Sequence, residues 1–467
     1  MKRARIFIAL WLTTFLCAGC AVGPNYSRPK VEVPGSYRGL APDASAQTEV
    51  ASFGNEKWWD AFQDQTLRDL IAAALKENYD VRISAARILQ ARAQLGIVRA
   101  DQYPTVGANA AAINERIPET KGRRAIETSA NQVSLSLAWE LDFWGKYRRA
   151  TESARANLLA NEWARQQVVS SLVSDVASAY FQLRELDLEL EISRNTLASR
   201  KDSLRLTQIL ADHGATSMLD VRQAEQLVYS AAATIPDLES RIEQQENFIS
   251  TLLGKNPEGI PRGKTLLEQP HAPEVPAGLP SALLERRPDI REAEQQLVAL
   301  NAQIGVAKAD YFPSITLTGT GGYQSSALSS LFTGPAGLWS FGGNLAQPVF
   351  EGGRIRNRVR FAEARRDEAT LVYQRAIQQA FREVSDALVG YRKSQEFRAN
   401  QELVTRAAED ATRLSNMRYK GGATSYLEVL DSNTRQFVAQ LTLAQAELNE
   451  LQSLVQIYRA LGGGWQQ

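Results

Sequence analysis

The chain is one structural unit written twice. Residues 93–104 read AQLGIVRADQYP, and residues 302–313 read AQIGVAKADYFP. Residues 214–221 (GATSMLDV) return as residues 422–429 (GATSYLEV), at a nearly constant offset of 208–209 residues. Duplication constrains a fold strongly, because both copies must form the same elements in the same order. The repeat predicts a quasi-symmetric wall and argues against a single catalytic pocket.

The duplication divides the chain into segments. Residues 63–254 are expected to form repeat 1 and residues 289–461 repeat 2, with a proline-rich linker at residues 255–288. Each repeat is expected to contain a helix, two strands and a long helical hairpin. An extended N-terminal arm at residues 20–62 precedes the repeats, and residues 462–467 form a C-terminal tail.

The first 19 residues have the segment order of an export signal. Basic residues precede an apolar run of 11 residues, which is too short to cross a membrane as a helix. Small residues then lead to Cys20, so the segment resembles a bacterial lipoprotein signal and predicts a covalent lipid on Cys20. Cys17 stands where leucine is usual, and an ordinary secretory signal is the alternative. Ala21, in place of aspartate, favours the outer membrane.

Composition argues against several classes of function. The 53 basic and 52 acidic residues give a net charge of +1, which offers no electrostatic footprint for nucleic acid. Cys17 and Cys20 are the two cysteines, and His213 and His271 lack the spacing of a metal site or a catalytic triad. We therefore expect no enzyme, no metal site and no cofactor other than the lipid.

Residues 131–143 have the clearest strand pattern. Apolar side chains from Val133 to Phe143 alternate with polar or small ones, which gives one apolar and one polar face. About 12 residues at ~3.3 Å each would cross a bilayer when tilted, although a soluble antiparallel strand shows the same alternation. The other expected strands are residues 105–117, 313–324 and 337–350.

Two stretches predict very long helices. Residues 146–212 contain neither Gly nor Pro, so we expect one helix about 100 Å long at 1.5 Å per residue. Leucine recurs every seven residues in its second half, and Ala179, Leu186 and Ser193 occupy the other seam position, as in a coiled coil. Residues 354–420 are expected to form the second long helix, with apolar residues at alternating spacings of four and three from Ile377 to Tyr391. Polar residues cover the remaining faces, which indicates helices surrounded by water.

Each long helix ends at a duplicated turn. Glycine there provides a left-handed cap, and Ser or Thr caps the return helix. Each copy should therefore double back, with hairpin tips near residues 215 and 423. The tip residues are Gly214, Ala215, Thr216, Ser217, Gly422, Ala423, Thr424 and Ser425.

The number of strands predicts an assembly. Each copy offers two strands, so one chain offers four, and an open sheet cannot lie in lipid with unpaired edges. Several chains must then close one barrel, and two, three or four chains would supply eight, twelve or sixteen strands. The helices would close the same ring, and a ring around a central axis is a tunnel.

Further motifs carry a family resemblance. The segments CAVGPNYSRP (20–29), WW (58–59), RRPDI (286–290) and FEGGR (350–354) resemble those of the TolC-like outer membrane factors, in the lipoprotein branch that includes OprM and the NodT proteins. The resemblance implies a mainly α fold with a transmembrane β portion. Three chains would complete a 12-stranded barrel, and their coiled-coil helices a periplasmic α-barrel.

The resemblance also implies partners and a gate. The expected partners are a periplasmic adaptor, which would contact the hairpin tips, and an inner-membrane pump, commonly of the resistance-nodulation-division type. By position in the family motif, the periplasmic gate is assigned to Tyr419, Leu427 and Asp431. Three copies of Leu427 would form an apolar constriction and three of Asp431 an acidic ring that favours cations. The alternatives are a coiled-coil seam position for Leu427 and a solvated helix face for Asp431.

The two hairpins are not equivalent in sequence. Asp220 stands in the first copy where Glu428 stands in the second. This difference allows one hairpin to open while the other stays in place.

Together these features predict the outer-membrane channel of a tripartite efflux system in a Gram-negative bacterium, which conducts small toxic solutes or drugs to the exterior. Two alternatives stay open. One is the same duct serving a type I protein-secretion system, and the other is a periplasmic coiled-coil lipoprotein without a channel. The strand pattern at residues 131–143 argues against the last.

Overall fold

The structure is a computed structural model of the 467-residue chain. It describes residues 21–38, 63–119, 122, 124–270 and 280–465. Cys20, the expected signal at residues 1–19 and most of the expected arm at residues 20–62 lie outside the described residues.

The chain divides into two compact units. Unit 1 comprises Met1–Lys30, Arg87–Glu162 and Glu292–Gln374. Unit 2 comprises Val31–Ala86, Trp163–Arg291 and Arg375–Gln467. Both copies of the duplication contribute segments to each unit.

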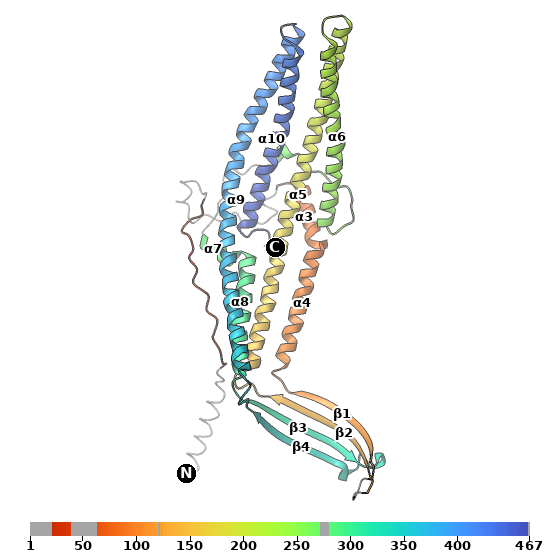
Figure 1. Ribbon diagram of the computed structural model, residues 1–467, viewed down its shortest axis with the longest axis vertical. Coiled ribbons are helices and arrows are strands. Elements are labelled where there is room, and N and C mark those ends of the chain that lie inside the picture. Colours follow the sequence, from red (N-terminus) through yellow and green to blue (C-terminus); the bar gives the residue numbers. More distant parts are fainter. Residues whose placement is uncertain (1–20, 39–62, 120–121, 123, 271–279, 466–467) are drawn as a thin grey trace. The chain divides into compact units, whose positions relative to one another are not determined.

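Unit 1 contains one antiparallel sheet of four strands in the order β1-β2-β3-β4. The strands are β1 (Thr105–Ile117), β2 (Ile126–Glu140), β3 (Ser314–Ser325) and β4 (Gly337–Ala346), and Figure 1 shows them side by side. The central β2–β3 pair joins the first copy to the second. Trp339 and Phe341 of β4 are 85% and 73% exposed, so described residues leave large apolar side chains of the sheet uncovered.

The strand ends differ from those expected from alternation. β2 begins at Ile126, five residues before the expected start, because its first residues pair with the end of β1. It ends at Glu140, and Gly145 then adopts a left-handed φ of 77° just before the next helix begins. β4 ends at Ala346, four residues before the expected end, and Pro348 beyond it has no N–H to offer a ladder.

An N-terminal strap, residues 21–28, lies against two helices within unit 1. Arg149, which is 5% exposed, donates to the side chain of Asn25 (2.8 Å). Arg28 donates two hydrogen bonds to the carboxylate of Glu294, at 2.6 and 2.9 Å. Arg149 belongs to α5 and Glu294 to α8 (Pro288–Ala309), so polar contacts fix the strap to helices from both copies.

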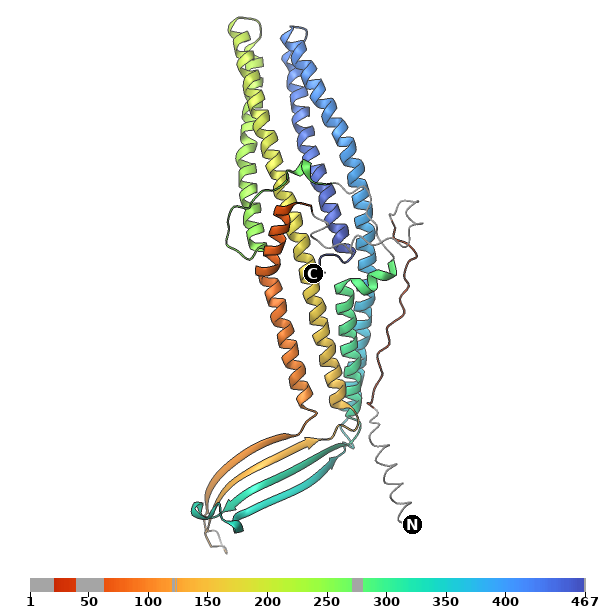
Figure 2. The ribbon, with the colours of Figure 1, turned by 180° about the vertical axis from the view of Figure 1, so that it is seen from behind.

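Four helices form two antiparallel hairpins, as the duplication predicts. Hairpin 1 is α5 (Lys146–Asp212) with α6 (Met218–Leu252), and hairpin 2 is α9 (Arg354–Lys420) with α10 (Tyr426–Ala460). Figure 2 shows each return helix lying beside its long partner. The long helices have 67 residues each and the return helices 35 each, so the two copies match in length. No helix of the described residues is long and apolar enough to cross a membrane.

The more deeply buried seam of α5 is not the one with the repeating leucines. Its members are at most 5% exposed and recur every seven residues: Ala179, Leu186, Ser193, Arg200 and Thr207. Of the expected leucine seam, Leu183 is fully buried, whereas the leucines at 190, 197 and 204 are only half-buried. Ala179, Ser193 and Thr207 are small, and small side chains let neighbouring helices approach closely. This explains why the seam is more deeply buried than the leucine seam.

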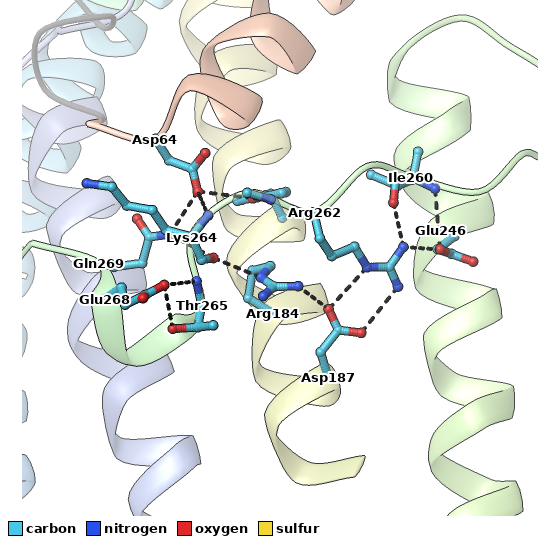
Figure 3. Close-up of polar contacts among 12 residues, drawn as sticks. Asp64, Arg184, Asp187, Glu246, Ile260, Arg262, Lys264, Thr265, Glu268 and Gln269 are labelled. Atoms are coloured by element: carbon cyan, nitrogen blue, oxygen red, sulfur yellow. Dashed lines mark hydrogen bonds and ion pairs between the residues drawn. The ribbon is translucent and has the colours of Figure 1, made fainter. Parts of the chain in front are cut away.

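The remaining helices of unit 2 include α3 (Gln65–Glu77), α7 (Pro280–Arg286) and the first part of α4 (Tyr79–Ala100). Asp64, 1% exposed, caps α3 by accepting from the Thr66 N–H (2.9 Å). Its other oxygen accepts from the Tyr180 hydroxyl (3.0 Å), the Lys264 N–H (3.0 Å) and the Gln269 amide (2.9 Å). One buried carboxylate therefore ties α3, α5 and the linker together (Figure 3).

A second set of contacts in Figure 3 fixes the linker to hairpin 1. Arg184 of α5 donates to the Lys264 carbonyl (3.0 Å). Arg262 of the linker forms ion pairs with Asp187 of α5 (3.1 Å) and with Glu246 of α6. The first part of the expected linker, residues 255–288, is thus held against both helices of hairpin 1.

Candidate functional site

Tip 1 is the turn between α5 and α6. Gly214 has a φ of 73°, in the left-handed region that side chains disfavour. The Ala215 N–H donates to the Leu210 carbonyl (2.8 Å) and closes the end of α5. Ser217 and Asp220 then form a capping box, in which each side chain accepts from the other residue's N–H at 3.3 Å.

Tip 2 has the same turn with different capping. Gly422 has a φ of 70°, and the Ala423 N–H donates to the Arg418 carbonyl (2.8 Å). Ser425 makes no side-chain cap. Glu428 instead forms an ion pair with Arg418 of α9, at 3.1 Å. The longer carboxylate of tip 2 therefore links the two helices of its hairpin, whereas Asp220 of tip 1 caps its own helix.

A small apolar cluster, here called the tip cluster, joins the two hairpins. Buried Ala224 of α6 packs with Tyr426 and Val429 of α10, and Leu204 of α5 and Tyr419 of α9 pack against them. The rings of Tyr419 and Tyr426 meet edge to face, with centroids 5.3 Å apart. Burial raises the pKa of Tyr426 to about 12, so its hydroxyl is neutral at physiological pH.

The three expected gate residues differ in their burial. Tyr419 packs into the tip cluster, and its hydroxyl is buried without a hydrogen-bond partner among the described residues. Leu427, 60% exposed, and Asp431 lie one turn apart on α10. Their face of the helix is opposite the one that Tyr426, Val429 and Ser432 bury. Asp431 forms an ion pair with Arg435, at 2.8 Å. Leu427 and Asp431 are therefore uncovered within the described chain, and their role in a gate stays a prediction.

Arg200 is the charged member of the buried seam. It is 4% exposed, and its guanidinium carbon lies 5.1 Å from the ring centroid of Phe437 on α10. Nη1 donates to the Leu227 carbonyl of α6 (2.9 Å), whereas Nε is buried without a hydrogen-bond partner in the described part of the chain. Burial lowers the pKa of Arg200 from its ordinary value. A cation thus lies between three helices of the two hairpins.

Comparison with known protein families gives a match on both copies of the duplication. A family model described as outer membrane efflux protein matches residues 70–255 and 279–463, one range on each copy. The chain belongs to the outer membrane efflux protein family. The resemblance inferred from the motifs is therefore confirmed, together with a mainly helical fold that carries a four-stranded sheet.

Relatives and solved structures of outer membrane efflux proteins match nearly the whole chain. It is 35% identical over 465 residues to the probable efflux pump outer membrane protein TtgC of Pseudomonas putida, covering 98% of this chain and 95% of TtgC. It is also 35% identical to outer membrane protein OprJ of Pseudomonas aeruginosa, covering 100% and 97%. The outer-membrane channel OprN matches with a TM-score of 0.84 at 33% identity, covering 96% of this chain and 100% of that one. The open state of the Neisseria gonorrhoeae MtrE outer membrane channel matches with a TM-score of 0.87 at 31% identity, covering 96% and 99%.

The contact between Arg200 and Phe437 was not predicted from the sequence of this outer membrane efflux protein. A signal for Arg200 exists, because it lies seven residues after Ser193 on the seam of Ala179 and Leu186. An arginine at a seam position is ordinarily expected to extend its charged end into water. Its burial depends on the ring of Phe437, which is 237 residues away in sequence.

Proposed function

We propose that this chain is the outer-membrane channel of a tripartite efflux system, a trimeric tunnel that passes small toxic solutes or drugs from a periplasmic adaptor and an inner-membrane pump to the exterior. The observation that carries the proposal is the match over nearly the full length to efflux pump outer membrane proteins and to solved channels. The proposed role is transport, and it requires no enzymatic step and no cofactor.

The sheet supports the trimer. β1 and β4 each pair on one side with a strand of this chain, so each has a free edge among the described residues. Free edges and exposed Trp339, Phe341 and Leu345 call for neighbouring strands and an apolar surrounding. Three chains would pool twelve strands around one axis, with the apolar side chains toward lipid.

The strap supports a lipid anchor at Cys20. Ala21, the next residue, lies so close to Gly145 that a Cβ there would be 2.7 Å from the Ala21 Cα. Gly145 lies between the end of β2 and the start of α5. A lipid on Cys20 would then be attached beside the sheet, the part proposed to contact the membrane.

The hairpins support the adaptor and gate assignments. Except for the half-buried Thr216 and Thr424, the eight tip residues are exposed, and therefore available to an adaptor. Leu427 and Asp431 present an uncovered apolar and acidic face of α10 that three chains can direct toward a common axis. In this assignment Tyr419 supports the gate through the tip cluster.

The relatives indicate the class of cargo. Proteins 34–37% identical to this chain are named as toluene, solvent and antibiotic efflux pump outer membrane proteins. We therefore place apolar solvents and antibiotics first among the proposed cargo.

The test is a deletion strain complemented with the wild-type gene or with an empty vector. The proposal expects at least about a fourfold rise in sensitivity to toluene, dyes or several antibiotics on deletion, reversed by the wild-type gene, and a stable ionic current from the purified protein in planar bilayers. Unchanged sensitivity with a blocked secretion of one protein would replace efflux by type I secretion. A water-soluble monomer that gives no current would overturn the channel altogether.

A further inference from the structure

We propose that Arg200 and Phe437 form a latch between the two hairpins of one protomer, and that release of this latch is a step in opening the end of the tunnel formed by the hairpin tips. The role in opening rests on the proposed function. The latch itself rests on contacts within unit 2.

The position of Arg200 makes it a joint between hairpins. Its guanidinium group is 5.1 Å from the Phe437 ring on α10 and bonds to the Leu227 carbonyl on α6 at 2.9 Å. Leu204, one turn further along α5, belongs to the tip cluster. Hairpin 2 cannot move away from hairpin 1 at this level without separating the cation from the ring.

The chemistry of the contact makes it reversible. No carboxylate forms an ion pair with Arg200 in the described residues, and its buried Nε–H has no acceptor. A desolvated cation on an aromatic face is attractive, but burial of a charge and an unsatisfied donor oppose it. Water would satisfy the guanidinium group when the hairpins separate, which lowers the free energy needed to break the contact.

The latch is present in one copy of the duplication only. With the 208-residue offset between the starts of α5 and α9, the position equivalent to Arg200 is Ala408, and the following Glu409 is exposed. Glu409 accepts a hydrogen bond from Gln440 of α10 within its own hairpin, at 2.9 Å. A buried cation near the tips thus comes from hairpin 1, whereas the interhairpin contact of Arg459 on α10 with Asp175 of α5 (3.9 Å) lies at the far end of α10. The two hairpins therefore contribute differently to the contacts near the tips.

The test is a reversal experiment on the full-length protein. Phe437→Leu keeps an apolar side chain but removes the aromatic face, so it leaves a buried cation without its partner. We expect the ratio of open to closed time in planar bilayers to rise about thirtyfold, because a desolvated cation–π contact is worth about that factor. Adding Arg200→Met to Phe437→Leu removes the buried charge that has lost its aromatic partner. The double variant should return the ratio of open to closed time to near the wild-type value.

A matched control uses Arg194 on the same helix. Arg194 is exposed and pairs with Glu239 of its own hairpin (2.8 Å). Arg194→Met added to Phe437→Leu should leave the open ratio raised. An unchanged open ratio in Phe437→Leu, or a reversal by Arg194→Met as complete as that by Arg200→Met, would overturn the latch.

A distance measurement separates failure of the latch from failure of the channel. Spin labels at Ala215 and Ala423, both exposed, report the separation of the two tips when labelled chains are diluted with unlabelled ones. Phe437→Leu should lengthen or broaden this distance, and adding Arg200→Met should restore it. Unchanged distances in Phe437→Leu overturn the latch even if current is normal, whereas restored distances without any current in the wild type contradict only the channel.

Discussion

At the residue scale, buried polar side chains control how the helices of unit 2 pack. Asp64 binds three donors from α5 and the linker, and Arg200 joins the hairpins. Glu185 of α5 is fully buried and accepts from the Gln182 amide (2.8 Å), but its second oxygen has no hydrogen-bond donor among the described residues. Glu189, one turn further along α5, forms an ion pair with Arg241 of α6 (3.5 Å). A proton on Glu185 would turn its carboxyl group into a donor toward the Glu189 carboxylate, so that the two carboxyl groups need not both be charged.

Burial, with the neighbouring Glu189, raises the pKa of Glu185 from 4.5 to about 8. The folded chain then keeps a proton that the unfolded chain releases, so stability falls as pH rises from 4.5 to about 8. Glu185→Gln should remove this loss and stabilise the protein by about 2 kcal/mol at pH ~9, with less difference at pH ~5. Thermal unfolding at a series of pH values measures it.

Glu191→Gln is the control for Glu185→Gln, because Glu191 is exposed on the same helix. It should leave the pH dependence unchanged. A Glu185→Gln variant whose melting temperature follows the wild type across this pH range would show that Glu185 is charged in the fold.

At the element scale, the tips show how the same turn can carry different capping. Gly214 and Gly422 have nearly the same φ, 73° and 70°, because both turns must reverse a helix within a few residues. The third residue of the return helix is Asp220 in tip 1 and Glu428 in tip 2, and the glutamate side chain is longer by one methylene group. Tip 1 has a capping box, whereas tip 2 has an ion pair with Arg418, whose counterpart in α5 is the uncharged Leu210.

Gly422→Val should destabilise tip 2 by about 1–2 kcal/mol, because a β-branched residue is strained in the left-handed region. No atom lies within 4 Å of a Cβ at Gly422, so the cost comes from the backbone alone. Faster hydrogen exchange at the Ala423 N–H, with efflux reduced, is the expected result. Gly259→Val is the control, since Gly259 has open space and no left-handed φ. Equal exchange in both variants would contradict the role of the turn.

At the scale of the whole molecule, the ion pair between Asp431 and Arg435 gives a sharper test of the gate than either residue alone. If three Asp431 carboxylates line the tunnel, Arg435→Gln should raise the preference for cations and Asp431→Asn should lower it, each severalfold. Reversal potentials in a salt gradient measure both. Asp410→Asn is the control, because Asp410 is exposed and pairs with Arg413 of its own helix. Identical selectivity in all variants would remove Asp431 from the gate.

The repeat, the helix lengths and the tip turns were predictable from sequence because each depends on neighbours in the chain. An absence of Gly and Pro defines α5, and Gly214 and Gly422 define its end and that of α9. The ends of β2 were less predictable, because its first residues owe their strand conformation to pairing with β1. Cys20 and the rest of the expected signal lie outside the described residues, and the lipid stays a prediction.

The sequence by itself determined that two equal copies exist, that each has two strands and a long hairpin, and that the family is one of outer membrane efflux proteins. Periodicity and motifs are local, so one chain suffices to read them. Only the tertiary structure decided which seam of α5 is the more deeply buried, that Tyr419 packs into the tip cluster, and that Arg200 lies against the ring of Phe437. Those outcomes depend on which side chains from different helices share one space, and no local pattern encodes that.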